Sequence, residues 1–146
     1  MKLVMHSYTF RTYPFEEAIR SALRFGWAAL ELQPCHFDRN DIENELPKAA
    51  ALANSHGIPI HCVDFSGDFI NDDAKIRETA VAGMETYIKT CAANGIHLLN
   101  GSAGAIALHE DWGKNGSALA TDAHYEIAAE AFRHLGKVAA QHKVEI

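Results

Sequence analysis

The segment Phe25-Gly26-Trp27-Ala28-Ala29-Leu30-Glu31-Leu32 joins the end of a predicted helix to a short apolar run. Gly26 is typical of a helix end, because the residue just past the last turn commonly adopts a positive φ. The apolar run that follows suits a buried strand. The same order recurs at His56-Gly57-Ile58-Pro59-Ile60 and at Asn94-Gly95-Ile96-His97-Leu98-Leu99-Asn100. The chain is therefore predicted to repeat one helix-to-strand unit.

Strands and helices are predicted to alternate on both sides of this junction. Strands are predicted at residues 3–5, 27–32, 58–65, 96–100 and 144–146, and helices at 14–25, 42–56, 74–94 and 122–142. The expected buried faces include Ala18, Ile19, Ala22, Leu23 and Phe25 in the first helix, and Ile76, Ala80, Met84, Tyr87, Ile88 and Cys91 in the third. This alternation, with one unit about every 30 residues, predicts an α/β fold with a parallel sheet.

Two parallel architectures fit the pattern: a doubly wound sheet and part of a TIM barrel. A doubly wound nucleotide-binding sheet needs a glycine-rich turn after its first strand, so that backbone amides can approach a phosphate. Residues 7–11 contain no glycine, which favours the barrel. A complete barrel has eight units in about 250 residues, and this chain supplies four and the start of a fifth. In both architectures, functional side chains gather at the carboxyl ends of the strands.

Composition argues against several classes of function. The 146 residues include 19 acidic and 13 basic side chains, a formal net charge of −6, without the basic cluster that nucleic-acid binding requires. No apolar run reaches the roughly 18 residues of a membrane span, and the N-terminus does not resemble a signal peptide. The cysteines Cys35, Cys62 and Cys91 are widely spaced, as free thiols in a reducing compartment would be. A cytoplasmic protein without a nucleic-acid or membrane partner is expected.

Five segments carry a resemblance to a known family. They are Ser7-Tyr8-Thr9-Phe10-Arg11, Pro14-Phe15-Glu16-Glu17-Ala18-Ile19, the first two helix-to-strand junctions quoted above, and the third junction extended to Ala93–Gly101. In this order and spacing they resemble the xylose isomerase-like TIM barrels, also called sugar phosphate isomerases/epimerases. The resemblance implies that residues 1–146 form a single incomplete domain. It would hold the N-terminal four βα units of a TIM (β/α)8 barrel and the start of strand five.

The resemblance also implies a function: a sugar or sugar-phosphate isomerase or epimerase that moves a proton next to a carbonyl. A divalent metal (Mn, Mg or Co) would stabilise the developing oxyanion. Family members hold this metal with a Glu at the end of strand five and with an Asp, a His and a Glu from later strands. These ligands and the catalytic carboxylates are expected beyond Ile146, and Glu145 lies too near the start of its strand to be one of them. The chain alone is therefore expected to be inactive and to hold no metal.

His6 and Glu31 are the first candidates for substrate-binding residues. His6 follows the first predicted strand and would project toward the barrel mouth, unless it is a hydrogen-bonded core histidine. Glu31 lies between Leu30 and Leu32, so if the leucines face the helices, Glu31 and Gln33 face the barrel interior. A carboxylate there must be hydrogen-bonded or hydrated. Glu31 is therefore either a pocket residue or a structural tie.

Three further candidates follow the later strands. His61 and Asp64 have opposite alternation and cannot both point inward; Asp64 lies nearer the carboxyl end and is preferred. Asn100 ends the fourth predicted strand and would bind a sugar hydroxyl or cap the next turn. Trp112 lies in the long connection 101–119, where it would stack on a sugar or pack on the barrel rim.

Two alternatives belong to other classes of function. Abasic-site endonucleases share the barrel but carry a zinc-binding histidine just after strand four, where this sequence reads Asn100-Gly101-Ser102-Ala103-Gly104. A non-catalytic half-barrel that binds carbohydrate or assembles with itself is also compatible with the sequence. Open strand edges favour pairing with another chain. The expected partners are a small sugar or sugar phosphate, and either a second copy or the missing C-terminal half of the barrel.

Overall fold

The computed structural model of the chain describes residues 3–106, 114 and 116–146. Its strands are β1 (Val4–His6), β2 (Ala29–Leu32), β3 (Ile60–Ser66) and β4 (Leu99–Ser102). Its α-helices are α1 (Phe15–Arg24), α2 (Ile42–Ser55), α3 (Ala74–Ala93) and α4 (Asp122–His142). Short 3-10 turns lie at Ser7–Phe10, Pro34–His36, Arg39–Asp41 and Ser117–Leu119. The predicted alternation of strands and helices is confirmed.

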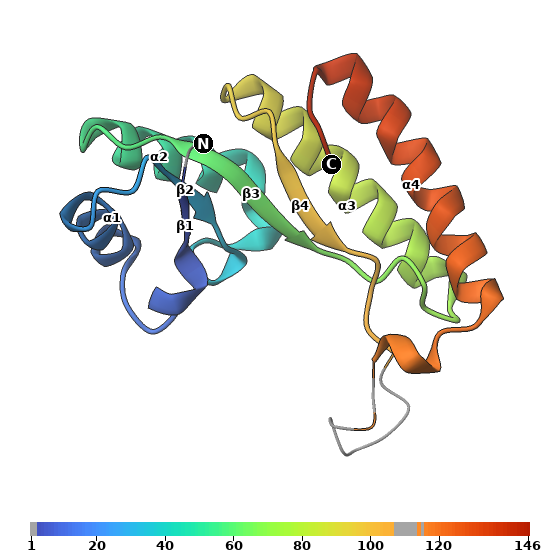
Figure 1. Cartoon of the computed structure of the whole chain (residues 1–146). Helices are drawn as coiled ribbons and strands as arrows, with labels where there is room; N and C mark the ends of the chain where they lie inside the picture. The colour runs from blue at the N-terminus through green and yellow to red at the C-terminus, as the bar shows by residue number, and fades with distance from the viewer. Residues whose placement is uncertain (1–2, 107–113, 115) are drawn as a thin grey trace.

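The four strands are parallel and lie side by side in chain order, β1-β2-β3-β4. A doubly wound sheet would place a later strand on the far side of β1, and this sheet does not. The chain therefore has the pattern of half a TIM barrel. Figure 1 shows the sheet curving through the molecule, with α3 next to β4 and α4 lying along α3. None of the described helices is long and apolar enough to cross a bilayer.

The C-terminal residues begin a further strand beside β4. Glu145 pairs in parallel with Leu98. The backbone N–H of Glu145 donates to the carbonyl of His97 at 2.9 Å, and the N–H of Leu99 donates to the carbonyl of Glu145 at 2.9 Å. The predicted start of strand five is present at Glu145.

The core lies between the sheet and the helices that cover one of its faces. Leu30, Leu32 and Val63 on the strands are completely buried, as are Ile19 on α1 and Leu46 on α2. The β2 pattern predicted from sequence is therefore correct: both leucines face the helices. This packing leaves the alternate side chains of each strand on the opposite, inner face of the sheet.

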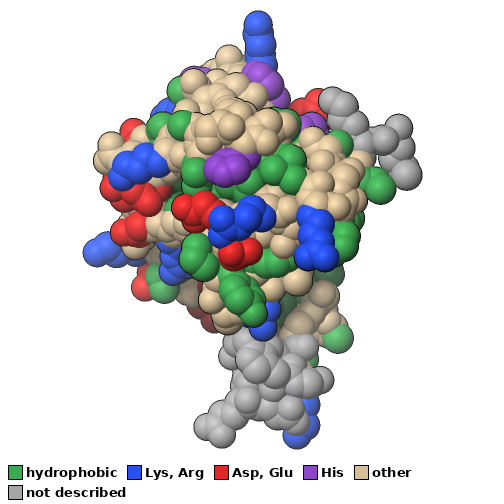
Figure 2. All heavy atoms as spheres, turned by 90° about the vertical axis from the view of Figure 1, so that its left-hand side faces the viewer, with side chains coloured by type: hydrophobic (Ala, Val, Ile, Leu, Met, Phe, Trp, Pro, Cys, Tyr) green, Lys and Arg blue, Asp and Glu red, His purple; other side chains and the backbone are tan. Residues whose placement is uncertain are grey.

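Three hydrophobic residues predicted to be buried are exposed. Leu23 and Phe25 are 43% and 71% exposed, because the buried stripe of α1 is Phe15, Ala18, Ile19 and Ala22, and Phe25 follows the helix end. Ile76 is 45% exposed because it lies in the first turn of α3, before the buried stripe that begins at Ala80. Figure 2 views the side of the molecule that carries α1 and shows hydrophobic side chains reaching the surface among charged ones.

The fourth strand also ends later than predicted. β4 continues to Ser102, so Asn100 is the second residue of the strand and does not end it. Its backbone pairs with Asp64 and that of Ser102 pairs with Ser66. A turn-capping role for Asn100 is therefore wrong, and its side chain is part of the sheet surface.

Candidate functional site

The inner face of the sheet gathers polar side chains from all four strands. Strand register places His6 beside Glu31 and Glu31 beside Cys62. Two residues further along β3, Asp64 pairs with Asn100 on β4. Paired residues of parallel strands point to the same face. Gln33 directly follows β2 and reaches the same face. We call these six side chains the inner cluster: His6, Glu31, Gln33, Cys62, Asp64 and Asn100.

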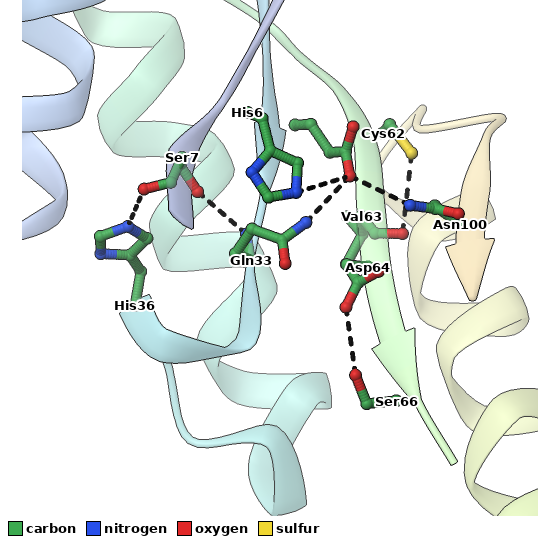
Figure 3. A network of polar contacts seen from close by, with 10 residues as sticks. His6, Ser7, Gln33, His36, Cys62, Val63, Asp64, Ser66 and Asn100 are labelled. Carbon is green, nitrogen blue, oxygen red and sulfur yellow. Dashed lines mark hydrogen bonds and ion pairs between the residues drawn. The ribbon is translucent and has the colours of Figure 1, made fainter. Parts of the chain in front are cut away.

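The Glu31 carboxylate lies at the centre of the inner cluster. Its Oε1 accepts hydrogen bonds from Nε2 of Gln33 at 2.9 Å and from Nδ2 of Asn100 at 3.2 Å. Nε2 of His6 lies 3.6 Å from the same oxygen. In Figure 3, His6, Gln33 and Asn100 come from separate elements and converge on one carboxylate. Within the described part of the chain, Oε2 of Glu31 has no hydrogen-bond partner, so it can accept a bond from a ligand.

The members of the inner cluster differ in their access to solvent. The side chain of His6 is 51% exposed and that of Glu31 is 19% exposed. His6 also packs edge-on against Tyr8, with ring centroids 6.2 Å apart. His6 is therefore not a buried core histidine. Glu31 ties β2 to β4 through its bond with Asn100, and its role as a pocket residue stays a prediction.

Asp64 lies in a less polar environment than an ordinary surface carboxylate. Burial raises its pKa, and the nearby charge of Glu31 acts in the same direction, while a hydrogen bond from Oγ of Ser66 (3.3 Å) opposes the rise. Burial likewise raises the pKa of the Cys62 thiol to about 12. Cys62 is therefore a neutral thiol at physiological pH, not a nucleophilic thiolate.

A second set of contacts holds the ends of β1 and β2 together. Ser7 is completely buried, and its Oγ accepts a hydrogen bond from the backbone N–H of Gln33 at 3.0 Å. Nε2 of His36 lies 3.0 Å from the carbonyl oxygen of Ser7 (Figure 3). These bonds fix the position of Gln33, which in turn orients the Glu31 carboxylate.

Four of the five residues predicted to bind substrate lie together in the structure: His6, Glu31, Asp64 and Asn100. Trp112 lies outside the described residues. That these residues bind substrate remains a prediction. Strand alternation predicted that Gln33 would face inward together with Glu31, but Gln33 was not among the predicted binding residues. Cys62 was not predicted at all, although its two-residue spacing from Asp64 places it on the same face. No local signal identifies Ser7 or His36, because their contact joins two different βα loops.

The described residues do not form a metal site. Among residues 3–106, 114 and 116–146, no three His, Cys, Asp or Glu side chains come together so that they could hold a metal ion. The described residues therefore do not supply a set of ligands for the divalent ion that the resemblance implies.

Comparison with protein-family models gives one match over most of the chain. Residues 19–146 match the model described as xylose isomerase-like TIM barrel. Comparison with curated proteins by sequence finds no significant match.

Solved structures with the same fold include two named epimerases and one protein with zinc. D-psicose 3-epimerase from Clostridium cellulolyticum H10, with D-tagatose, is 20% identical, with a TM-score of 0.73 over 99% of this chain and 50% of that one. The 3-keto-D-glucoside 4-epimerase YcjR from E. coli is 18% identical, with a TM-score of 0.72 over 99% of this chain and 54% of that one. The IOLI protein with a binding zinc atom is 14% identical, with a TM-score of 0.76 over 100% of this chain and 50% of that one. The chain thus spans about half the length of these structures.

Proposed function

Because the chain belongs to the xylose isomerase-like TIM barrel family, we propose that it forms half of the substrate pocket of a sugar isomerase or epimerase. The family model covers residues 19–146, and two of the similar structures are named as sugar epimerases. The inner cluster lies on the concave face of the half-barrel, where a substrate would be enclosed. Its central feature, the Glu31 carboxylate held at Oε1 by two amides while Oε2 has no hydrogen-bond partner among the described residues, is the observation that carries the proposal.

Five of the six residues of the inner cluster have a defined part in this proposal. Oε2 of Glu31 accepts a hydrogen bond from a sugar hydroxyl, and the two amide donors on Oε1 hold the carboxylate in position. His6, half exposed beside Glu31, faces the same part of the substrate. Asp64 and Asn100 lie on neighbouring strands at paired positions and contact an adjacent hydroxyl.

The proton transfer itself is not assigned to residues of this chain. Isomerisation next to a carbonyl requires an acid and a base, and the resemblance assigns these roles and a divalent ion to later strands. The described residues lack a ligand set for that ion. In this proposal the chain binds and orients the sugar, and the complete barrel carries out the chemistry.

The first test is a titration of the 15N-labelled 146-residue chain with D-fructose, followed by NMR. We expect shifts at the backbone amides of the inner cluster. Glu31→Gln should weaken this binding about tenfold, the value of one hydrogen bond to a charged group. Glu126→Gln is the matched control, because it removes one exposed carboxylate on α4.

The titration has a clear negative outcome. Binding energies of only about 1.4 kcal/mol are detectable with about 100 mM sugar. Failure of the inner-cluster amides to shift at that concentration would show that this face does not take part in sugar binding.

A second proposal concerns assembly and is favoured by the free side of β1. In the described part of the chain, β1 pairs with β2 only, and Leu3 next to it is 56% exposed. Unpaired strand edges with apolar neighbours associate with other chains. The chain expressed alone should therefore associate with itself.

A further inference from the structure

The chemistry of the inner cluster restricts which part of a sugar it can face. The six side chains supply two carboxylates, two amides, one imidazole and one thiol, and none of them is a lysine or an arginine. A phosphate group is recognised by cationic side chains or by convergent N–H donors. The N–H donors that converge in the inner cluster, those of Gln33 and Asn100, already hold the Glu31 carboxylate, and the negative charge of this carboxylate would repel a phosphate.

Its hydrogen-bonding capacity is also weighted toward acceptors. Gln33 and Asn100 each use an N–H to hold Oε1 of Glu31. One N–H on each amide and the ring of His6 remain as donors. The remaining acceptors are more numerous: Oε2 of Glu31, the Asp64 carboxylate and the two side-chain carbonyls. Such a surface is complementary to groups that donate, and a sugar hydroxyl donates whereas a phosphate dianion only accepts.

The negative charge of the inner cluster also disfavours a phosphate. Burial, and to a smaller extent the charge of Glu31, raise the pKa of Asp64, so a further negative charge is disfavoured beside these two groups. A bound phosphate would bring up to two more negative charges into the same partly buried space. Arg11 comes from the same end of the sheet, but its guanidinium lies over the ring of Tyr8, 4.9 Å from the centroid.

From these observations, and resting on the proposed function, we infer that Glu31 and Asp64 determine specificity. Through them, this half of the pocket accepts an uncharged, hydroxyl-bearing part of the sugar and rejects a phosphate group. A phosphorylated substrate would have to place its phosphate elsewhere, away from the inner cluster.

The test compares D-fructose with D-fructose 6-phosphate on the 146-residue chain, using the NMR shifts of the inner-cluster amides at low salt. We expect the phosphorylated sugar to bind at least about tenfold more weakly, the effect of repulsion between charges a few ångströms apart near a protein surface. Raising the salt concentration should narrow the difference, because salt screens repulsion.

Two variants assign the effect to particular carboxylates. Glu31→Gln and Asp64→Asn each remove one charge and should reduce the preference for D-fructose over its phosphate. Glu126→Gln removes the same charge from α4 and should leave the preference unchanged.

The outcomes separate this inference from the proposed function. If D-fructose 6-phosphate shifts the inner-cluster amides with an affinity equal to or higher than that of D-fructose, the inference is wrong although the sugar site stands. A preference for D-fructose that persists in both variants also overturns the assignment to Glu31 and Asp64. If neither sugar shifts these amides, the proposed function fails.

Discussion

The side chain of Asn100 on β4 donates a hydrogen bond to the carboxylate of Glu31 on β2, at 3.2 Å, although β3 lies between the two strands. The curvature of the sheet brings side chains of non-adjacent strands together on its concave face. The bond therefore links the geometry of the half-barrel to the orientation of the proposed substrate-binding carboxylate.

Removing this bond should lower stability without changing the fold. Asn100→Ala loses one hydrogen bond to a partly buried charged group, and we expect a loss of about 1.5 kcal/mol in the free energy of unfolding. Urea unfolding at pH 7 measures it. Unchanged stability would show that the contact contributes nothing.

Asn100→Asp should lower the free energy of unfolding at pH 7 more than Asn100→Ala does. The new carboxylate faces Glu31, and like charges raise the pKa of both groups in the folded state. Folding is then opposed at pH values above the raised pKa, and stability should recover as the pH falls below it. The check is urea unfolding at pH 7 and pH 5, where equal stability of Asn100→Asp and the parent at pH 7 would contradict the prediction.

Two glycine-to-alanine changes should alter the free energy of unfolding in opposite directions. Gly26 has a φ of +72° just past α1, so Gly26→Ala should destabilise by about 1 kcal/mol through backbone strain alone, since its Cβ would meet no atom within 4 Å. Gly136 lies inside α4 with open space around it, so Gly136→Ala should stabilise by about 0.5–1 kcal/mol. Thermal unfolding of both variants tests the pair. A shift in the same direction for both would refute the assigned backbone conformations.

The contact between α3 and α4 should respond to acid. Nε2 of His134 lies 2.6 Å from Oε1 of Glu85, and this hydrogen bond, more than the charge of Lys89, holds the pKa of Glu85 below its usual value. A carboxyl group whose pKa is lower in the folded state than in the unfolded state stabilises the fold at pH values above the unfolded-state pKa. This stabilisation is lost as the pH falls through the folded-state pKa. Replacing His134 should therefore raise the pKa of Glu85.

NMR titration of the Glu85 side-chain carboxyl in His134→Gln and Lys89→Gln provides the measurement. The larger upward shift is expected in His134→Gln. Equal shifts in the two variants would mean that the charge of the surroundings, not the hydrogen bond, controls Glu85.

The three cysteines should differ in their rate of alkylation. Cys35 is exposed, whereas Cys62 and Cys91 are buried and burial raises the pKa of each thiol to about 12. Iodoacetamide at pH 8 should label Cys35 in the folded chain and all three cysteines in urea. Mass spectrometry of peptides identifies the labelled residue, and rapid labelling of Cys62 in the native state would contradict its burial beside Asn100.

Self-association should depend on the β1 side of the sheet. A charge beside an edge strand opposes strand pairing, so Leu3→Lys should lower the association constant of the isolated chain. Sedimentation velocity over a range of concentrations measures the effect. Tyr125→Lys is the control, because Tyr125 is similarly exposed on α4; equal effects of the two changes would place the interface elsewhere.

Much of the fold could be predicted because its signals are local. Glycines at positions 26, 57 and 95 all have positive φ and separate helices from strands, as expected. Asp73, directly before α3, caps the helix by accepting a hydrogen bond from the N–H of Lys75, which is only two residues away. Burial was harder to predict at element ends. Phe25 and Ile76 continue the apolar composition of their helices but lie outside the packed stripe.

By itself, the sequence determined the parallel α/β pattern and the alternation that puts Glu31 and Gln33 on the face opposite to Leu30 and Leu32; the burial of the two leucines then showed which face is the inner one. Helix ends and strand alternation depend on neighbouring residues, so they can be read along the chain. Only the tertiary structure decided that Asn100 reaches Glu31 across β3 and that Ser7 joins His36 and Gln33. These contacts depend on strand register and sheet curvature, which are set by the packing of helices against strands about 30 residues apart in the sequence.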